Sequence, residues 1–248
     1  MGRWSRVLAA AAVQWLDAPA GLRWLDVGCG TGALSAAIVV GAAPVSLVGV
    51  DPSEAYVDLA TARLHGAPAT FQVGQAVPLP MPAASVDRVA SGLVLNFVPD
   101  AVASVREMQR VLVPGGVAAA YVWDYADGMQ MLRSFWDAAI AEDAAAEELD
   151  EGPRFPICRP GGIERCFREA RMTDLVAQPL VIDMVFRDFD DYWDPFLGGQ
   201  GPAAGYCMSL EPEARAQLRA RLEATLPTEP DGSIPLSGRA WAVRGVSP

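Results

Sequence analysis

A run of alternate glycines has the composition of a loop that binds a cofactor through its backbone. Gly28, Gly30 and Gly32 lie in the segment Trp24-Leu-Asp-Val-Gly-Cys-Gly-Thr-Gly-Ala33, between an apolar stretch and an alanine-rich one. Without side chains, such a loop lets a ligand approach the backbone closely. Asp51 follows Gly28 by 23 residues, and a carboxylate at that spacing can accept hydrogen bonds from both ribose hydroxyls of an adenosine. The spacing predicts a cofactor that contains adenosine.

Two kinds of adenosine cofactor fit this loop. The pattern Gly28-x-Gly30-x-x-Ala33 satisfies the fingerprint of a nicotinamide dinucleotide site. Asp26, however, would repel a pyrophosphate and attract the ammonium group of a methionine moiety. The chain also contains no lysine, so it cannot supply a hydride-transfer pair of the Tyr-x-x-x-Lys type. These features favour S-adenosylmethionine, and an NAD-dependent dehydrogenase stays as an alternative.

Strands and helices must alternate around these residues to bring them together. We expect five strands in the first half of the chain, over 23–27, 45–50, 70–73, 86–90 and 117–123. Helices are expected between them, over 33–40, 53–64 and 100–112. This alternation is typical of βαβ units and a parallel sheet. Two further strands, over 175–185 and 239–244, make seven.

The same segments resemble the class I methyltransferases that use S-adenosylmethionine, especially the branch similar to ubiquinone- and menaquinone-biosynthesis enzymes (methyltransferase type 11). Asp26–Gly32, with the letters DVGCGTG, resembles the first motif of that family. The further matches are Val48-Gly-Val-Asp-Pro-Ser53, the loop from Leu79-Pro-Met-Pro82 to Val86-Asp87, Ser91-Gly-Leu93 and Arg110-Val-Leu-Val-Pro-Gly-Gly116. The resemblance covers about residues 20–123. It implies an α/β, Rossmann-like class I methyltransferase fold, with a mostly parallel seven-stranded sheet and helices on both faces.

The resemblance implies roles for the residues of the glycine loop. Asp26 and the loop of Gly28, Cys29 and Gly30 would hold the methionine part of the cofactor. Asp51 would hold the ribose. On this basis the cofactor is S-adenosylmethionine and the product S-adenosylhomocysteine.

The resemblance also places the adenine and the methyl end. Pro52 would pack against the adenine. In the family an acidic residue often binds the adenine amino group where this chain has Gln75, followed by Ala76. Gln75 can accept from that amine through its carbonyl oxygen but contributes no charge. Ser91 and Leu93, after the fourth strand, would line the methyl end.

Residues after the fourth and fifth strands are candidates for contact with the substrate, because ligands of open α/β sheets bind beyond the carboxyl ends of the strands. Asp124 or Tyr125 could orient or deprotonate a substrate, and they are the catalytic candidates. Trp123 could form a pocket wall, although Trp123 and Tyr125 could equally be aromatic residues at the edge of the core. Asn96 could bind a substrate or cap its loop. Trp4 could cover the methionine end of the pocket or simply belong to the first helix.

An aromatic-rich insertion over residues 186–201 is interpreted as part of a lid over the pocket. Tyr192 and Phe196 are its candidate substrate contacts, and its aromatic character indicates an apolar or ring-shaped substrate. The helical spacing of these aromatic residues also fits a role in the core.

The chain is expected to form a single domain over 1–248. An N-terminal helix over 1–20 would cover the cofactor, and 21–123 would bind it. Residues 124–248 would form the substrate side, with a lid insertion over 186–236 and closing strands. Helices are expected there over 129–149, 161–171 and 211–226, with a loop over 152–158.

The composition excludes several other classes. The formal net charge is −11 and every cation is arginine, which is unsuited to binding a phosphate backbone, so no nucleic-acid partner is expected. His65, the only histidine, is interpreted as a helix-terminus residue. The four cysteines form no C-x-x-C pair, so no metal site is expected. Gly41 and Pro44 interrupt the apolar stretch 34–50, and no secretion signal is evident, which predicts a cytoplasmic protein without a membrane partner.

We therefore expect a methyltransferase that acts on a small, apolar or aromatic organic molecule. Methyl transfer from a sulfonium depends mainly on alignment of the reacting atoms. A base is needed only where the nucleophile arrives protonated. The alternative is a methyltransferase-like protein that binds the cofactor but serves as a cyclase or scaffold. The acceptor atom and the oligomeric state stay open.

Overall fold

The computed structural model describes residues 2–198 and 201–248. Met1, in the predicted N-terminal helix, and Gly199 and Gln200, in the predicted aromatic insertion, lie outside the described residues. No helix within the described ranges is both long and apolar enough to cross a bilayer.

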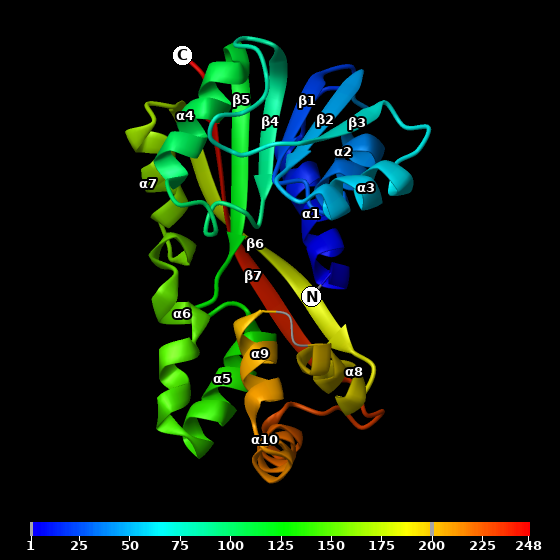
Figure 1. The fold of residues 1–248 in the computed structure, drawn as a ribbon, viewed down its shortest axis with the longest axis vertical. Coiled ribbons are helices and arrows are strands. Elements are labelled where there is room, and N and C mark those ends of the chain that lie inside the picture. The colour runs from blue at the N-terminus through cyan, green and yellow to red at the C-terminus, as the bar shows by residue number, and fades with distance from the viewer. Residues whose placement is uncertain (1, 199–200) are drawn as a thin grey trace. The chain divides into compact units, whose positions relative to one another are not determined.

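Seven strands form one sheet in the order β3-β2-β1-β4-β5-β7-β6 (Figure 1). The strands are β1 (Arg23–Val27), β2 (Ser46–Asp51), β3 (Ala69–Val73), β4 (Val86–Gly92), β5 (Leu112–Trp123), β6 (Thr173–Phe186) and β7 (Ile234–Val246). β1 to β5 pair in parallel. β7 runs antiparallel to β5, because backbone hydrogen bonds join Gly115 to Ser247 and Asp124 to Arg239. The prediction of a mostly parallel seven-stranded sheet is therefore confirmed.

β5 begins at Leu112, five residues earlier than expected. The preceding helix ends before Pro114, as predicted, but Pro114, Gly115 and Gly116 belong to the strand and not to a loop. The N–H of Gly115 donates to the carbonyl of Ser247 at 2.9 Å, and the N–H of Ser247 donates to Gly116 at 2.8 Å. This pairing with the distant chain end supplies the ladder that the local pattern does not reveal.

The contacts of the chain divide it into two compact units. We call residues 2–122, 160–180 and 241–248 the strand-rich unit, and residues 123–159 and 181–240 the helical unit. The chain passes from one to the other at the end of β5, between residues 159 and 160, and within β6 and β7.

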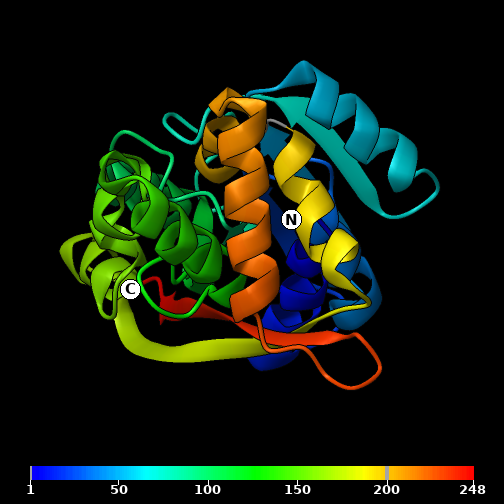
Figure 2. The ribbon, with the colours of Figure 1, turned by 90° about the horizontal axis from the view of Figure 1, so that it is seen from below.

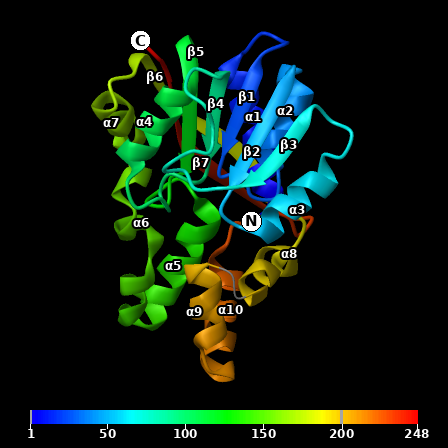
Figure 3. The same cartoon turned by 45° about the horizontal axis from the view of Figure 1, so that its top comes forward.

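The strand-rich unit contains α1 (Gly2–Leu16), α2 (Ala33–Ala42), α3 (Glu54–Arg63), α4 (Ala101–Val111) and α7 (Gly162–Glu169). Along the chain, β2 and β3 are added to one side of β1, and β4 and β5 are added to its other side. Right-handed crossovers therefore place α2 and α3 on one face and α4 on the other, as Figure 3 shows. α1 packs against α2, and α7 against α4.

Local sequence explains where the helices of this unit begin. The side chain of Ser53 accepts the N–H of Tyr56 at the start of α3, and Asp100 accepts that of Ala103 at the start of α4. Such caps satisfy N–H groups that have no partner within the helix. The unit's core is built from large apolar side chains, of which Leu8, Trp24, Leu25, Ile38, Leu47 and Met108 are almost fully buried.

The helical unit contains α5 (Gln130–Glu142), η1 (Ala144–Leu149), α6 (Glu151–Arg154), η2 (Pro156–Cys158), α8 (Phe189–Trp193), η3 (Asp194–Gly198), α9 (Pro202–Ser209) and α10 (Pro212–Thr225). The helix expected over 129–149 is interrupted at Asp143, whose side chain accepts the N–H of Ala145 and starts a new turn. The loop expected over 152–158 contains two short helical turns. Figure 2 shows α8 and α10 side by side, where the guanidinium of Arg219 donates to Asp190 at 2.7 Å.

Candidate functional site

The carboxylate of Asp51 can accept one further hydrogen bond on each of its two oxygens. It ends β2 with 8% of its surface exposed. One oxygen accepts the N–H of Gly30 and the other accepts the N–H of Ser53, both at 2.9 Å. Each carboxylate oxygen retains a further lone pair. Two neighbouring hydroxyls, as on a ribose, match these two acceptors.

Asp26 is a fully buried acid whose hydrogen bonds are incomplete. Its Oδ2 accepts the hydroxyl of Ser35 at 2.6 Å, whereas its Oδ1 has no hydrogen-bond partner among the described residues. Burial raises its pKa to about 7, because the charged form loses its hydration, while Ser35 acts in the opposite direction. A buried acceptor without a donor is costly. A ligand ammonium would supply the missing donor and the countercharge.

At Gly28 the glycine loop approaches a neighbouring side chain too closely for a Cβ. Gly28 has φ +73°, and a Cβ there would lie 2.4 Å from a methyl group of Val94. Gly30 also has positive φ, but the space beside it is open. Between them, Cys29 is buried and its sulfur packs beside Gly49, so its backbone rather than its thiol borders the loop.

The predicted adenine and methyl contacts differ in exposure. Pro52 and Gln75 are exposed and Ala76 is half-buried. The amide of Gln75 makes no hydrogen bond within the described part of the chain. Ser91 is buried and donates to the carbonyl of Val27 at 3.0 Å, so its side chain joins β4 to β1. Leu93 is half-buried with φ +65°, and such strain in a non-glycine residue is often found at binding sites.

Two of the predicted substrate residues belong to the strand-rich unit. Asn96, after β4, is half-buried, and its Nδ2 is a buried donor without a hydrogen-bond partner in the described structure. Trp4 is 9% exposed, and the guanidinium of Arg3 lies 4.4 Å from its ring centroid. The unpaired amide of Asn96 is the feature that favours contact with a ligand over the capping role.

The remaining predicted residues belong to the helical unit. Asp124 is 1% exposed and its carboxylate is engaged on both oxygens. Arg239 donates to Oδ2 from Nε at 2.7 Å and pairs through Nη2 at 2.6 Å, while Asp127 donates its N–H to Oδ1 at 3.1 Å. These contacts position the turn after β5. A catalytic role for Asp124 stays a prediction, and these bonds leave its carboxylate little freedom for proton transfer.

Trp123, the last residue of β5, and Tyr125, two residues after it, are both buried. Trp123 packs against Gly238 of β7. The ring of Tyr125 lies 5.7 Å from that of Phe155, and its hydroxyl makes no hydrogen bond to another described residue. The nearby Cys158 is buried, which raises its pKa to about 12 and keeps it a thiol at neutral pH. Tyr125 is therefore the catalytic candidate whose polar atom is available.

The aromatic residues of the predicted lid form the core of the helical unit. Phe196 stacks on Phe135 with centroids 4.4 Å apart, and it is 3% exposed. Tyr192 is fully buried, and its hydroxyl donates to the carbonyl of Met131 at 2.9 Å. Contact of Tyr192 or Phe196 with a substrate stays a prediction.

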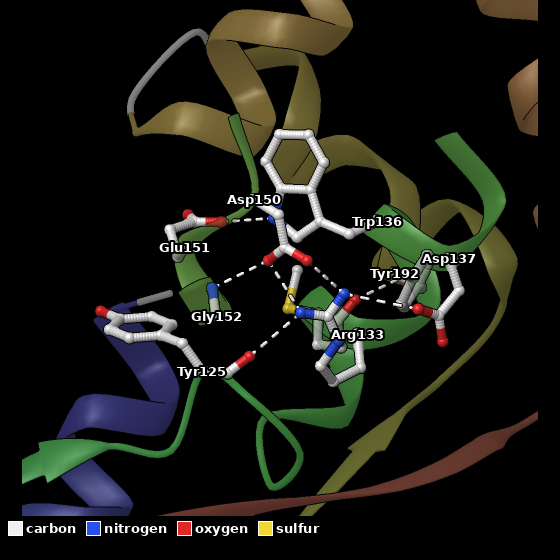
Figure 4. Close-up of polar contacts among 9 residues, drawn as sticks. Tyr125, Arg133, Trp136, Asp137, Asp150, Glu151, Gly152 and Tyr192 are labelled. Atoms are coloured by element: carbon white, nitrogen blue, oxygen red, sulfur yellow. Dashed lines mark hydrogen bonds and ion pairs between the residues drawn. The ribbon is translucent and has the colours of Figure 1, made fainter. Parts of the chain in front are cut away.

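A network of buried charges in the helical unit was not predicted (Figure 4). Arg133 binds both oxygens of Asp150, through Nη1 at 2.7 Å and Nη2 at 2.8 Å. Beside this pair, Glu151 is 5% exposed and accepts the indole N–H of Trp136. An acidic dipeptide before a glycine suggests a solvated turn, so its sequence gave no sign of burial.

The sheet order and the site together define the class I methyltransferase fold, with Asp26, the glycine loop and Asp51 at the carboxyl ends of β1 and β2. Residues 25–120 match the methyltransferase domain family Methyltransf_11. This part of the chain is a methyltransferase domain. Among curated proteins, none matches the chain significantly.

Solved structures share the fold at low identity. A putative methyltransferase from Bacillus halodurans has a TM-score of 0.62 at 15% identity, covering 96% of this chain and 98% of that one. A second match is phosphoethanolamine N-methyltransferase 2 of Haemonchus contortus, in complex with phosphomonomethylethanolamine and S-adenosylhomocysteine. Its TM-score is 0.60 at 16% sequence identity, and the match covers 97% of this chain and 52% of that one. The [4+2]-cyclase SpnF has a TM-score of 0.54 at 19% sequence identity, and the match covers 97% of this chain and 80% of that one.

Proposed function

We propose that this protein transfers a methyl group from S-adenosylmethionine to a small organic molecule with an apolar or aromatic body. The observation that carries the proposal is the pair of incomplete acids in the strand-rich unit. Asp51 offers one open acceptor on each oxygen, and Asp26 has a buried oxygen without a donor. A ribose diol and an ammonium, both present in S-adenosylmethionine, complete them.

The described residues suit this cofactor better than a dinucleotide. Asp26 would hold the ammonium, Asp51 the ribose, and the amide of Gln75 the adenine amino group. A pyrophosphate would instead bring negative charge to the loop beside Asp26, whose burial already disfavours its charged form. When bound, S-adenosylmethionine supplies an electrophilic methyl group. The protein's contribution is to hold the acceptor in line with it.

Aromatic residues of the helical unit support the proposal of a small apolar or aromatic substrate. The rings of Tyr125 and Phe155 pack together, and Tyr125 retains 9% exposure. Aromatic faces bind both apolar bodies and cations. In the strand-rich unit, taken by itself, Asn96 has a side-chain donor without a partner in the described structure. The complex of the Haemonchus contortus neighbour likewise contains a small methylated molecule.

Calorimetric titration tests the cofactor and a transfer assay tests the reaction. S-adenosylhomocysteine should bind the wild-type protein in the micromolar range, and NAD should give no heat. A panel of small acceptors incubated with methyl-labelled S-adenosylmethionine should then yield a labelled product. Failure of S-adenosylhomocysteine to bind contradicts the proposal. Binding without transfer to any acceptor supports the cyclase or scaffold alternative instead.

A further inference from the structure

The net charge of the chain lies wholly in one of its two units. The helical unit contains nineteen acidic residues and eight arginines, whereas the strand-rich unit contains eleven of each. The helical unit therefore carries the whole formal charge of −11, and the strand-rich unit is neutral. A field of one sign attracts ligands of the opposite sign and repels those of the same sign. The helical unit thus favours cationic ligands over anionic ones.

Within this unit, Glu151 is a buried acid that no arginine neutralises through an ion pair in the described structure. One carboxylate oxygen accepts the indole N–H of Trp136, and the other accepts no hydrogen bond from another described residue. The nearby Arg154 lies instead over the ring of Phe155, 5.8 Å from its centroid. Burial raises the pKa of Glu151, because its charged form loses hydration. A bound cation would restore the missing interaction.

The adjacent Asp150 is a contrasting case one residue away. It accepts two hydrogen bonds from Arg133, at 2.7 and 2.8 Å, and a third from the N–H of Gly152 at 2.8 Å. The fold therefore supplies Asp150 with a full set of donors and a countercharge. Glu151 receives one neutral donor from another residue and no ion pair, although it is equally buried, and the charge of Arg154 acts on it only from a distance. Contacts within the fold account for the burial of both Asp150 oxygens. They supply a donor from another residue to only one of the two Glu151 oxygens.

The hydroxyl of Tyr125 is a second polar group with unused hydrogen-bonding capacity. Tyr125 is 9% exposed, and its hydroxyl has no hydrogen-bond partner among the described residues. The pKa of Tyr125 is raised first by burial, then by Cys158, and then by the charge of Glu151, so the Glu151 side chain lies close enough to act on it. Figure 4 shows the Tyr125 hydroxyl and the second Glu151 oxygen on the same side of the network, both directed away from the Arg133–Asp150 pair.

We propose that Glu151 and Tyr125 together bind the acceptor substrate, and that the group they bind is a cationic nitrogen, as in a small aromatic or aliphatic amine. This inference rests on the proposed function and specifies its substrate class. The ammonium would donate to the second carboxylate oxygen of Glu151 and to the hydroxyl oxygen of Tyr125. The ring of Tyr125 can also attract the cation through its face.

Other small molecules fit these two groups less well. A carboxylate or phosphate would place a second negative charge beside a buried acid. A neutral alcohol could donate one hydrogen bond, but a hydrogen bond between two charged groups is roughly twice as strong as one between neutral groups. The predicted order of affinity is therefore amine, then alcohol, then acid.

Three probes of similar size test the substrate class on the wild-type protein. Phenethylamine, 2-phenylethanol and 3-phenylpropionate are titrated into protein saturated with S-adenosylhomocysteine, and binding is measured by calorimetry or ligand-observed NMR. Phenethylamine should bind at least about tenfold more tightly than the alcohol, as expected when a charge-assisted hydrogen bond replaces a neutral one. The acid should bind most weakly. Equal affinity for the three probes, or a preference for the acid, overturns the inference.

Two matched substitutions then locate the site. Glu151→Gln preserves an acceptor for Trp136 but removes the charge, and it should weaken phenethylamine binding about tenfold without changing the affinity for 2-phenylethanol. Glu148→Gln makes the same change at an exposed position three residues earlier and should alter neither affinity. If Glu151→Gln fails to fold, Tyr125→Phe provides the second test, with an expected loss of about threefold. Equal effects of the position 151 and 148 variants contradict the site.

The affinity for S-adenosylhomocysteine distinguishes the two levels of the proposal. If the wild-type protein does not bind it, the proposed function fails. If it binds but the protein shows no preference for phenethylamine, the proposed function stands and the amine site is wrong.

Discussion

The carboxylate of Asp51 accepts the backbone N–H of Gly30 at 2.9 Å, so the acid at the end of β2 also holds the glycine loop that follows β1. These two elements are neighbours in the sheet, with Asp26 opposite Gly49 and Val27 opposite Val50. A ligand held by Asp51 therefore meets a loop that is already positioned. This arrangement reduces the ordering that binding would otherwise require.

Replacing Asp51 by asparagine should weaken S-adenosylhomocysteine binding by about 100-fold. Asparagine loses one of the two acceptors for the ribose and removes the charge, and two hydrogen bonds to a charged group are worth about 3 kcal/mol. Calorimetric titration measures the effect. Asp58→Asn, an exposed acid on α3, serves as the control and should bind like the wild type. An unchanged affinity in Asp51→Asn would show that the carboxylate does not hold the ribose.

Asp26 should make the stability of the ligand-free protein depend on pH. Burial raises its pKa to about 7, so the folded chain binds this proton more tightly than the unfolded chain does. Stability therefore falls as pH rises from the ordinary carboxyl range to about 7, and then levels off. Asp26→Asn removes this loss. Its advantage in free energy of unfolding over the wild type should grow by about 2 kcal/mol between about pH 5.5 and pH 8.

Urea denaturation at the two pH values measures this difference, and Asp58→Asn again provides the comparison. The same Asp26→Asn protein should lose S-adenosylhomocysteine binding, because it lacks the charge that would pair with the ammonium. Parallel stabilities of wild type and variant at both pH values would mean that Asp26 titrates normally.

Local pattern in the sequence was sufficient to predict the glycine loop and the parallel strands around it. The glycine loop, Asp51 and the parallel strands around them follow from short apolar runs, each closed by residues with a definite backbone preference. Such signals lie within a few residues of the feature that they specify. Gly28 shows this directly, because its positive φ and its contact with Val94 both require the absence of a side chain.

The helical unit could not be predicted in the same way, because its polar contacts join distant segments. Asp124 pairs with Arg239, 115 residues later, and Arg133 with Asp150 across an interruption in the expected helix. The burial of Glu151 depends on such packing, and no periodic pattern marks an acid as buried. The aromatic residues over 186–201 fitted both a lid and a part of the core. The stacking of Phe196 on Phe135 is a tertiary contact that no local pattern reveals.

Gly28→Ala should destabilise the fold for two separable reasons. A Cβ would meet Val94 at 2.4 Å, and overpacking of this kind costs about 1–3 kcal/mol. Positive φ adds about 1–2 kcal/mol for a residue with a Cβ. Val94→Ala in the same protein should recover the first part only. Urea denaturation of the single and double variants measures the coupling, and complete recovery in the double variant would show that φ contributes nothing.

Arg133→Met should destabilise the helical unit by about 3–5 kcal/mol, since it leaves the buried carboxylate of Asp150 without its countercharge. The side chains of Arg133 and Asp150 are only 15% and 7% exposed, so water cannot replace the lost partner. Arg187→Met is the matched control. Arg187 pairs with Asp188, but both are well exposed, and surface pairs of this kind contribute about 0–1 kcal/mol.

Chemical denaturation and limited proteolysis across α5 and α6 compare the two arginine variants. Because Asp26 and Asp51 belong to the strand-rich unit, folded Arg133→Met protein should retain S-adenosylhomocysteine affinity within about twofold, well below the tenfold that 1.4 kcal/mol represents. Loss of the same stability in both variants would mean that the burial of the Arg133–Asp150 pair has no energetic consequence. Greater loss in Arg133→Met, with cofactor binding retained, would assign the pair to the architecture beside Glu151 and would leave Glu151 itself free for a ligand.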